Sequence, residues 1–284
     1  LNDITWSYYF DQYKLIPQYK ILNFDMSIDE FKIIFYWEYF HRILARLIGL
    51  FFLLPLIYFY FFKKIETKYL NYCYLIFILI LIQGVIGWYM VKSGLVNNVT
   101  VSHYRLSIHL SIAIIIISSI FWLIKNISSG KNKIFFKFSK NNSPYLILIL
   151  MIFVQIIMGA FVSGLDAGRI YQTWPLMGNS FFPNDLVYKD LVNFESHSLV
   201  QFYHRSLAYV ICLYILFLAV NIYKKKIISL YNPLKILLLF LFLQIILGIS
   251  TLVSGLNIFL ASIHQITSVL LVFSAINLYF LRAK

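Results

Sequence analysis

The chain has 284 residues, of which 61% are hydrophobic and 12% are charged, and its formal net charge is +13. Its mean hydropathy of +0.80 excludes an ordinary soluble enzyme. Several apolar runs reach the roughly 20 residues that a helix needs to cross a bilayer core. We therefore expect an all-α, polytopic membrane protein. In such a protein the excess of Lys and Arg sets the orientation in the bilayer and does not indicate nucleic-acid binding.

The chain begins with a polar stretch, rich in aromatic residues, that we expect to lie on the outer membrane surface. Within it, Ser27 followed by Glu30 has the pattern of a capping box, which predicts that a helix begins just after Ser27. Seven membrane helices are then predicted, at residues 31–62, 69–91, 104–125, 144–163, 197–223, 233–253 and 259–281. The chain thus divides into an outer surface segment (1–32), a first-half bundle (33–125), a basic linker (126–143) and a second-half bundle (144–281).

Basic residues gather in the loops at one end of the predicted helices, among them Lys63, Lys131 and Lys224. The positive-inside rule places this end in the cytoplasm, or in the matrix of a mitochondrion. We therefore expect an integral protein of the bacterial cytoplasmic membrane or of the mitochondrial inner membrane. The long loop 164–196 would then face the periplasm or the intermembrane space.

The two halves of the chain repeat the same polar residues in the same order. Residues 38–42 (Glu-Tyr-Phe-His-Arg) correspond to residues 201–205 (Gln-Phe-Tyr-His-Arg), about 160 positions later. Further along each half, the equivalent residues are Gln83 and Gln244, Gly87 and Gly248, and His109 and His264. This order predicts two pseudo-repeated four-helix bundles, in which the glycines allow close helix packing.

The helix that carries Gln155 and Gly159 has no counterpart in the first half of the sequence. The repeat therefore predicts a further membrane helix ahead of Leu1. The seven helices of this chain would then be part of an eight-helix protein.

Four of the six histidines are equivalent between the halves, His41 and His109 in the first and His204 and His264 in the second. Each lies a few residues inside the outer end of its predicted helix, at a depth of about 8–13 Å for a rise of 1.5 Å per residue. One histidine near a membrane surface is usually an interfacial or hydrogen-bonded residue, but four at matched depth favour a haem or metal role. Two imidazoles on facing helices can bind a haem iron from both sides.

Three charged residues lie beside these histidines. Arg42 and Arg205 each follow the first histidine of a half, and they can extend toward lipid headgroups or pair with haem propionates. Glu38 stands where the second half has Gln201. A carboxylate at a site of chemistry can move a proton or stabilise positive charge. The alternative is that Glu38 only pairs with Arg42 or with a neighbouring helix.

The outer loop carries a specific motif, at residues 164–168 (Gly-Leu-Asp-Ala-Gly) and 173–178 (Thr-Trp-Pro-Leu-Met-Gly). Together with the two His-Arg motifs and the paired histidines, it resembles the haem A synthase family, and especially the proteobacterial and mitochondrial branch. The resemblance covers nearly the whole chain. Some members have a cysteine pair in the outer loops, whereas Cys73 and Cys212 lie in apolar runs here, so no disulfide is expected.

The resemblance implies an enzyme that oxidises the C8 methyl group of haem O to the formyl group of haem A for cytochrome c oxidase. It implies a haem b on His204 and His264, substrate haem near His41 and His109, and Glu38 as the catalytic carboxylate. The expected partners are haem O, the enzyme that produces it, an electron donor that the sequence does not identify, and the lipid bilayer. The sequence leaves open a homo-oligomer.

Two rival interpretations remain at this stage. The first is a bis-His membrane cytochrome b that transfers electrons without modifying haem, which predicts functionally similar halves. The second is a transporter that uses intramembrane polar residues and binds no haem. The difference between Glu38 and Gln201 and the motif of the outer loop argue against the first rival.

Overall fold

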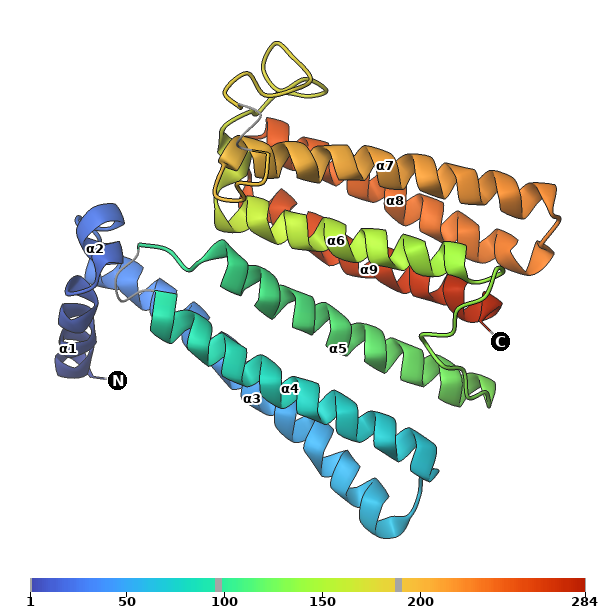
Figure 1. Cartoon of the computed structure of the whole chain (residues 1–284). Helices are drawn as coiled ribbons and strands as arrows, with labels where there is room; N and C mark the ends of the chain where they lie inside the picture. Colours follow the sequence, from blue (N-terminus) through green and yellow to red (C-terminus); the bar gives the residue numbers. More distant parts are fainter. Residues whose placement is uncertain (1, 95–98, 187–190, 284) are drawn as a thin grey trace. The chain divides into compact units, whose positions relative to one another are not determined.

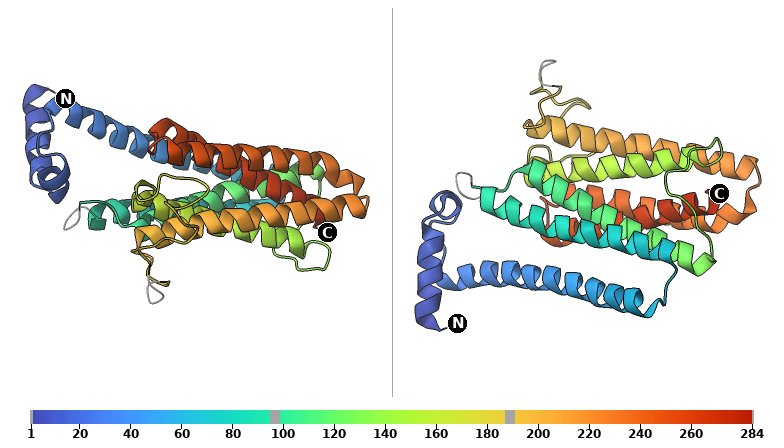
Figure 2. Two further views of the ribbon diagram at one scale, coloured as in Figure 1. Left: turned by 90° about the horizontal axis from the view of Figure 1, so that it is seen from above. Right: turned by 60° about the horizontal axis from the view of Figure 1, so that its bottom comes forward.

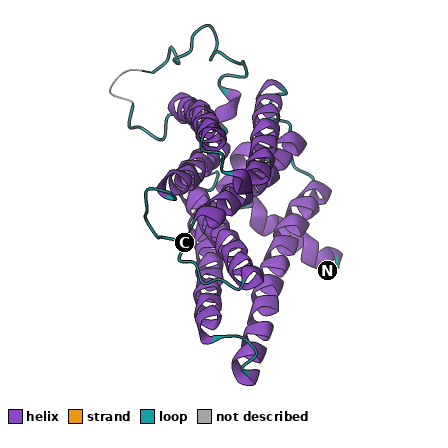
Figure 3. Cartoon of the chain, turned by 90° about the vertical axis from the view of Figure 1, so that its right-hand side faces the viewer, coloured by secondary structure: helices purple, strands orange, loops and turns teal. Residues whose placement is uncertain are grey.

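The computed structural model describes residues 2–94, 99–186 and 191–283 (Figure 1). This described part consists of helices joined by loops, and it contains no β-strand (Figure 3). Seven of its helices are long and apolar enough to cross a membrane. They are α3 (Ile28–Phe62), α4 (Thr67–Gly94), α5 (His103–Ser129), α6 (Ser143–Gly164), α7 (His197–Lys224), α8 (Tyr231–Val253) and α9 (Ile258–Arg282). The predicted all-α, polytopic membrane architecture is confirmed.

The largest difference between predicted and observed helix ends is at α5, which was expected to end at residue 125 and continues to Ser129. Two side chains accompany the extra turn, since Asn126 donates to the carbonyl of Trp122 and Ser129 donates to that of Lys125. Gly130 then has a φ of 60°, the left-handed conformation in which a glycine commonly ends a helix.

The chain forms two compact units, Leu1–Ile112 and Ala113–Lys284, whose boundary falls within α5. The division into bundles at residues 33–125 and 144–281 stays a prediction. In the first unit, α3 packs against α4, and α1 (Asp3–Lys14) lies across the first turns of α3 (Figures 1 and 2). A short helix, α2 (Pro17–Leu22), connects α1 to α3.

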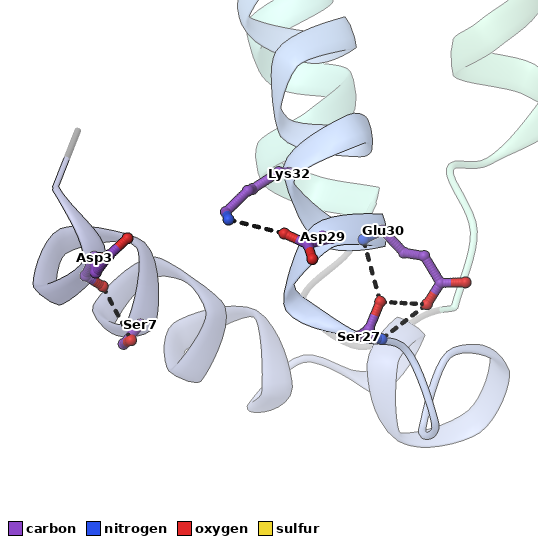
Figure 4. Close-up of polar contacts among 6 residues, drawn as sticks. All are labelled: Asp3, Ser7, Ser27, Asp29, Glu30 and Lys32. Atoms are coloured by element: carbon purple, nitrogen blue, oxygen red, sulfur yellow. Dashed lines mark hydrogen bonds and ion pairs between the residues drawn. The ribbon is translucent and has the colours of Figure 1, made fainter.

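The start of α3 is fixed by the predicted capping box. The backbone N–H of Glu30 donates to Ser27 Oγ at 3.3 Å, and Ser27 N donates to the Glu30 carboxylate at 2.8 Å (Figure 4). Below this cap, Trp6 and Phe10 of α1 are buried against Phe31. The surface segment is therefore attached to the first membrane helix by an aromatic cluster.

In the second unit, α6, α7, α8 and α9 lie side by side as a bundle (Figures 1 and 2). Helix α6 packs along both α7 and α9, and α8 packs along α9. Most of the fully buried side chains of these helices are aliphatic, among them Leu148, Ile215, Leu237 and Ile276. This bundle supports the first turns of α7 and α9, where His204 and His264 lie.

The basic linker is attached to the end of α9. Lys133 Nζ donates to the carbonyl of Phe280 at 2.7 Å and also to that of Ala283. These carbonyls belong to the end of a helix, where no further turn supplies a donor and a cation is favourable. Trp122 of α5 stacks on Tyr279 within the same cluster.

Candidate functional site

His109 and His264 occupy the same local environment in the two halves of the chain. Gln83 Nε2 on α4 lies 3.3 Å from His109 Nε2 on α5. Gln244 Nε2 on α8 lies 3.3 Å from His264 Nε2 on α9. The sequence repeat is therefore also a repeat of side-chain geometry.

A glycine lies against the edge of each of these imidazole rings. A Cβ atom added to Gly87 would be 3.0 Å from Cε1 of His109, and one added to Gly248 would be 3.0 Å from Cε1 of His264. Gly84, one turn before Gly87, has no such neighbour within 4 Å. The sequence predicted that these glycines serve helix packing, but at Gly87 and Gly248 the missing side chain makes room for the imidazole.

His204 has a related but different environment. Gln155 Nε2 on α6 lies 3.1 Å from His204 Nδ1, and it also donates to the backbone carbonyl of His204 at 2.9 Å. A Cβ atom added to Gly159 would be 3.2 Å from His204 Cε1. Three helices thus present a glutamine and, four residues later, a glycine to a histidine on the following helix.

Within each half, the two histidines lie within electrostatic range of each other, His41 of His109 and His264 of His204. Their pairing as ligands of one group stays a prediction. Among the described residues, no hydrogen-bond partner lies near Nδ1 of His109 or of His264, although both atoms are buried. A buried polar atom without a partner is costly, so each of these imidazoles has a nitrogen suited to a further ligand.

Glu38 and Arg42 are paired with each other on α3. Arg42 Nη2 donates to the Glu38 carboxylate at 3.0 Å, and both side chains are 53% exposed. The structure thus contains the ion pair that the sequence left open as an alternative to catalysis. His41, between them in sequence, is also exposed.

The equivalent residues of the second half hold the outer loop. Gln201 is buried and donates to the carbonyl of Tyr171 at 2.8 Å. The guanidinium of Arg205 donates to the carbonyl of Thr173 at 2.7 Å, and to those of Pro175 and Leu176 at 3.4 and 3.3 Å. Gln201 therefore anchors the outer loop, whereas Glu38 pairs with Arg42 on its own helix.

A second contact attaches the same loop through Asp185. The carboxylate of Asp185 accepts hydrogen bonds from Tyr171 Oη at 2.7 Å and from Ser198 Oγ, in the first turn of α7, at 2.5 Å. Burial is the largest single effect and opposes the charged form, but the hydrogen bonds from Ser198, from Tyr171 and from the backbone N–H of Asp185 together outweigh it and hold the pKa of Asp185 below its ordinary value. The hydrogen bond to Asp185 in turn raises the pKa of Tyr171. Residues 187–190 of the loop lie outside the described part of the chain.

These features lie within the region that defines a known family. The sequence model of the family described as COX15-CtaA, cytochrome oxidase assembly protein, matches residues 1–276. The chain belongs to this family. The matched residues include both histidine pairs and the outer loop, so the match covers both halves of the repeat.

Several known proteins are similar to this chain over most of their length. The chain is 48% identical to the protein named Heme A synthase of Pelagibacter ubique (strain HTCC1062) over 283 residues, which cover 96% of this chain and 81% of that protein. It is 40% identical to Heme A synthase of Wolbachia pipientis wMel over 285 residues, covering 99% and 79%. The identity to Heme A synthase of Rickettsia africae (strain ESF-5) is 38% over 287 residues, covering 98% and 83%. The resemblance inferred from the motifs is confirmed.

From the sequence, Gln83, Gln155 and Gln244 were expected only as polar residues of the helices, with no role beside the histidines. The structure places each of them against one of the candidate ligands. A sequence signal for this was present, because a carboxamide is costly inside a membrane helix and here recurs four residues before a glycine.

Proposed function

We propose that the chain is a haem A synthase, an oxidoreductase that converts the C8 methyl group of haem O to the formyl group of haem A for cytochrome c oxidase. Two facts support this function together. The chain belongs to the cytochrome oxidase assembly family and aligns over nearly its whole length with proteins named Heme A synthase. It also presents two histidine pairs in a duplicated helical setting, which is what one resident haem and one substrate haem require.

In the second half, His204 and His264 are the proposed ligands of a haem b. The residues fit this group because the two imidazoles lie within electrostatic range of each other, and because His264 has a buried ring nitrogen without a partner among the described residues. Arg205 Nη1 is likewise buried without such a partner, although the other end of the guanidinium is bound to the loop. This free end is our proposed contact for a propionate. A haem iron bound here would supply one-electron transfer.

In the first half, His41 and His109 are the proposed ligands of the substrate haem, and Glu38 is the proposed catalytic residue. Oxidation of a methyl carbon with water as the oxygen source releases protons, and a carboxylate beside the reacting carbon could accept them. Glu38 lies one turn of helix from His41. The carboxylate of Glu38 accepts a hydrogen bond from Arg42. The carboxylate would accept a proton or stabilise positive charge on the reacting carbon. Arg42 would move from Glu38 to a substrate propionate.

The rival function is a bis-His cytochrome b that only transfers electrons. The equal distances in the Gln83–His109 and Gln244–His264 pairs favour it, since they make the two halves locally alike. The family membership and the carboxylate present in one half only favour the enzyme.

The remaining assignments concern the surroundings of the protein. The chain is an integral membrane protein. We place loop 164–196 on the periplasmic or intermembrane-space side because the basic linker and the end of α9 carry Lys and Arg, the composition of a cytoplasmic or matrix side. The partners would be the enzyme that supplies haem O and an electron donor.

Co-expression with a source of haem O, followed by haem extraction and mass analysis, tests the function. We expect haem A among the extracted pigments and a six-coordinate, low-spin haem b in the spectrum of the purified protein. A low-spin haem b without haem A would support the cytochrome instead. A protein that carries no haem would contradict both functions.

A further inference from the structure

We infer that Gln83 and Gln244 are positioning residues that hold the imidazoles of His109 and His264 in the orientation needed to bind haem iron. The inference rests on the proposed function in one respect, since it takes these histidines to be iron ligands. In each half, the helix before the histidine contacts the imidazole twice, through the carboxamide of a glutamine and through the backbone at a glycine.

The geometry of the two sites carries the inference. In both, the carboxamide nitrogen lies 3.3 Å from the ring Nε2, while the glycine four residues later lies against Cε1. Each ring is therefore confined between one polar group and the bare backbone of the helix before it. The other ring nitrogen, Nδ1, is buried and has no hydrogen-bond partner among the described residues.

Each of these glutamines keeps, inside its helix, a polar atom that no described residue satisfies. The carboxamide oxygens of Gln83 and Gln244 are buried and have no hydrogen-bond partner within the described part of the chain. A polar group kept at such a cost inside an apolar helix indicates a use for it. Rotation of the carboxamide by 180° exchanges its nitrogen and oxygen, so the same side chain can accept a hydrogen bond from a ring N–H.

An accepting carboxamide would act on the iron through the imidazole. A hydrogen bond from the second ring nitrogen fixes the orientation and the tautomer of a ligating histidine, and it raises the basicity of the ligand. A more basic ligand stabilises ferric over ferrous iron and so lowers the reduction potential. Gln244 would thus set the potential of the resident haem, and Gln83 would hold the substrate haem in a fixed orientation.

Gln155 differs from Gln83 and Gln244 in its hydrogen bonds. Its carboxamide nitrogen donates to the backbone carbonyl of His204 at 2.9 Å in addition to its contact with the ring. Part of its function is therefore to join α6 to α7. We expect its replacement to affect the stability of the bundle more than the potential of the haem.

The test compares Gln244→Leu with Gln244→Glu in the full-length, detergent-purified protein that carries haem b. Leucine removes the hydrogen bond at nearly constant volume, and glutamate provides a stronger acceptor. We expect Gln244→Leu to retain haem b about 10- to 100-fold less tightly. The same variant should shift the ferric/ferrous equilibrium toward ferrous by about tenfold, which is about 59 mV for one electron. Gln244→Glu should shift it in the opposite direction.

Two controls separate this effect from general damage. Gln265→Leu makes the same replacement at an exposed glutamine beside His264 and should keep the potential and the electron paramagnetic resonance g values of the wild type. Gln83→Leu should leave the spectrum of haem b unchanged and weaken the binding of added haem O. Should Gln244→Leu fail to fold, Gln244→Asn withdraws the carboxamide by one methylene group and should shift the potential in the same direction.

The outcomes distinguish this inference from the proposed function. If His264→Ala keeps a six-coordinate haem b, the proposed ligands are wrong. If His264→Ala loses it while Gln244→Leu retains the affinity, potential and g values of the wild type, the ligands stand and the role of Gln244 is overturned.

Discussion

The carboxylate of Glu38 accepts a hydrogen bond of 3.0 Å from Arg42, one turn further along α3. Both side chains are about half exposed on the surface of α3, so a ligand can reach them. A substrate carboxylate could take over Arg42 and leave Glu38 free to act as a base.

Replacement of Glu38 by glutamine should stop haem A formation and leave the proposed haem b of the second half bound. Glutamine keeps the shape and can still accept a hydrogen bond from Arg42, but it cannot take up a proton. We expect the rate of haem A formation to fall by about 100- to 10,000-fold. Haem extraction after co-expression with a haem O source measures it. Glu30→Gln, a change at the capping box of the same helix, is the matched control, and undiminished haem A in Glu38→Gln would remove the catalytic assignment.

Replacement of His264 by alanine should abolish the six-coordinate, low-spin spectrum expected of the proposed haem b. The haem would lose one of its two proposed ligands, and among the described residues no group of three His, Cys, Asp or Glu could hold a metal in its place. His197→Ala is the control, since His197 is exposed at the first residue of α7. Optical spectra of the purified variants measure the effect, and a wild-type spectrum in His264→Ala would contradict the ligand assignment.

Addition of one methyl group at Gly248 should disturb the proposed haem b without replacing a ligand. The new Cβ would lie 3.0 Å from the ring of His264, closer than nearly all such contacts, so the imidazole must move by a few tenths of an ångström. We expect weaker haem retention and shifted g values in Gly248→Ala. Gly84→Ala is the control, because nothing lies within 4 Å of its Cβ position. Identical spectra in the two variants would show that the glycine does not shape the site.

Replacement of Arg205 by alanine should loosen the outer loop. Arg205 donates to three backbone carbonyls of the loop, and a hydrogen bond that involves a charged group contributes about 1.5–3 kcal/mol. Loss of even one such bond corresponds to cleavage at least about tenfold faster by a protease that acts on the opened loop. Arg169→Ala is the control, because Arg169 is exposed and lies 3.9 Å from its nearest carboxylate. Equal cleavage rates would mean that Arg205 does not hold the loop.

The attachment of the loop through Asp185 should depend on acid. The pKa of Asp185 is lower in the folded protein than in the unfolded chain, so its contribution is complete above the unfolded value of about 3.9. The contribution should be lost as the pH falls through the lower, folded value. Hydrogen exchange of loop peptides between pH 3 and 7, corrected for intrinsic rates, should therefore rise at the acid end. In Asp185→Asn this additional rise should be absent.

The sequence by itself determined the helices and the order of their polar residues. Hydropathy, the length of each apolar run and the capping box at Ser27 are local properties, and a bilayer leaves an apolar segment little alternative to a helix. The equivalence of His109 with His264 also came from the sequence, because a duplicated chain keeps its spacing.

Only the tertiary structure decided what each polar side chain contacts. Whether Gln244 meets His264 depends on how α8 and α9 are rotated about their own axes when they pack, and no single helix contains that information. The same holds for Arg205 and Gln201, whose partners are backbone carbonyls of a loop with a path set by the folded bundle. The sequence therefore indicated which residues to expect at the site, whereas the packing of the helices decided which of these residues contact each other.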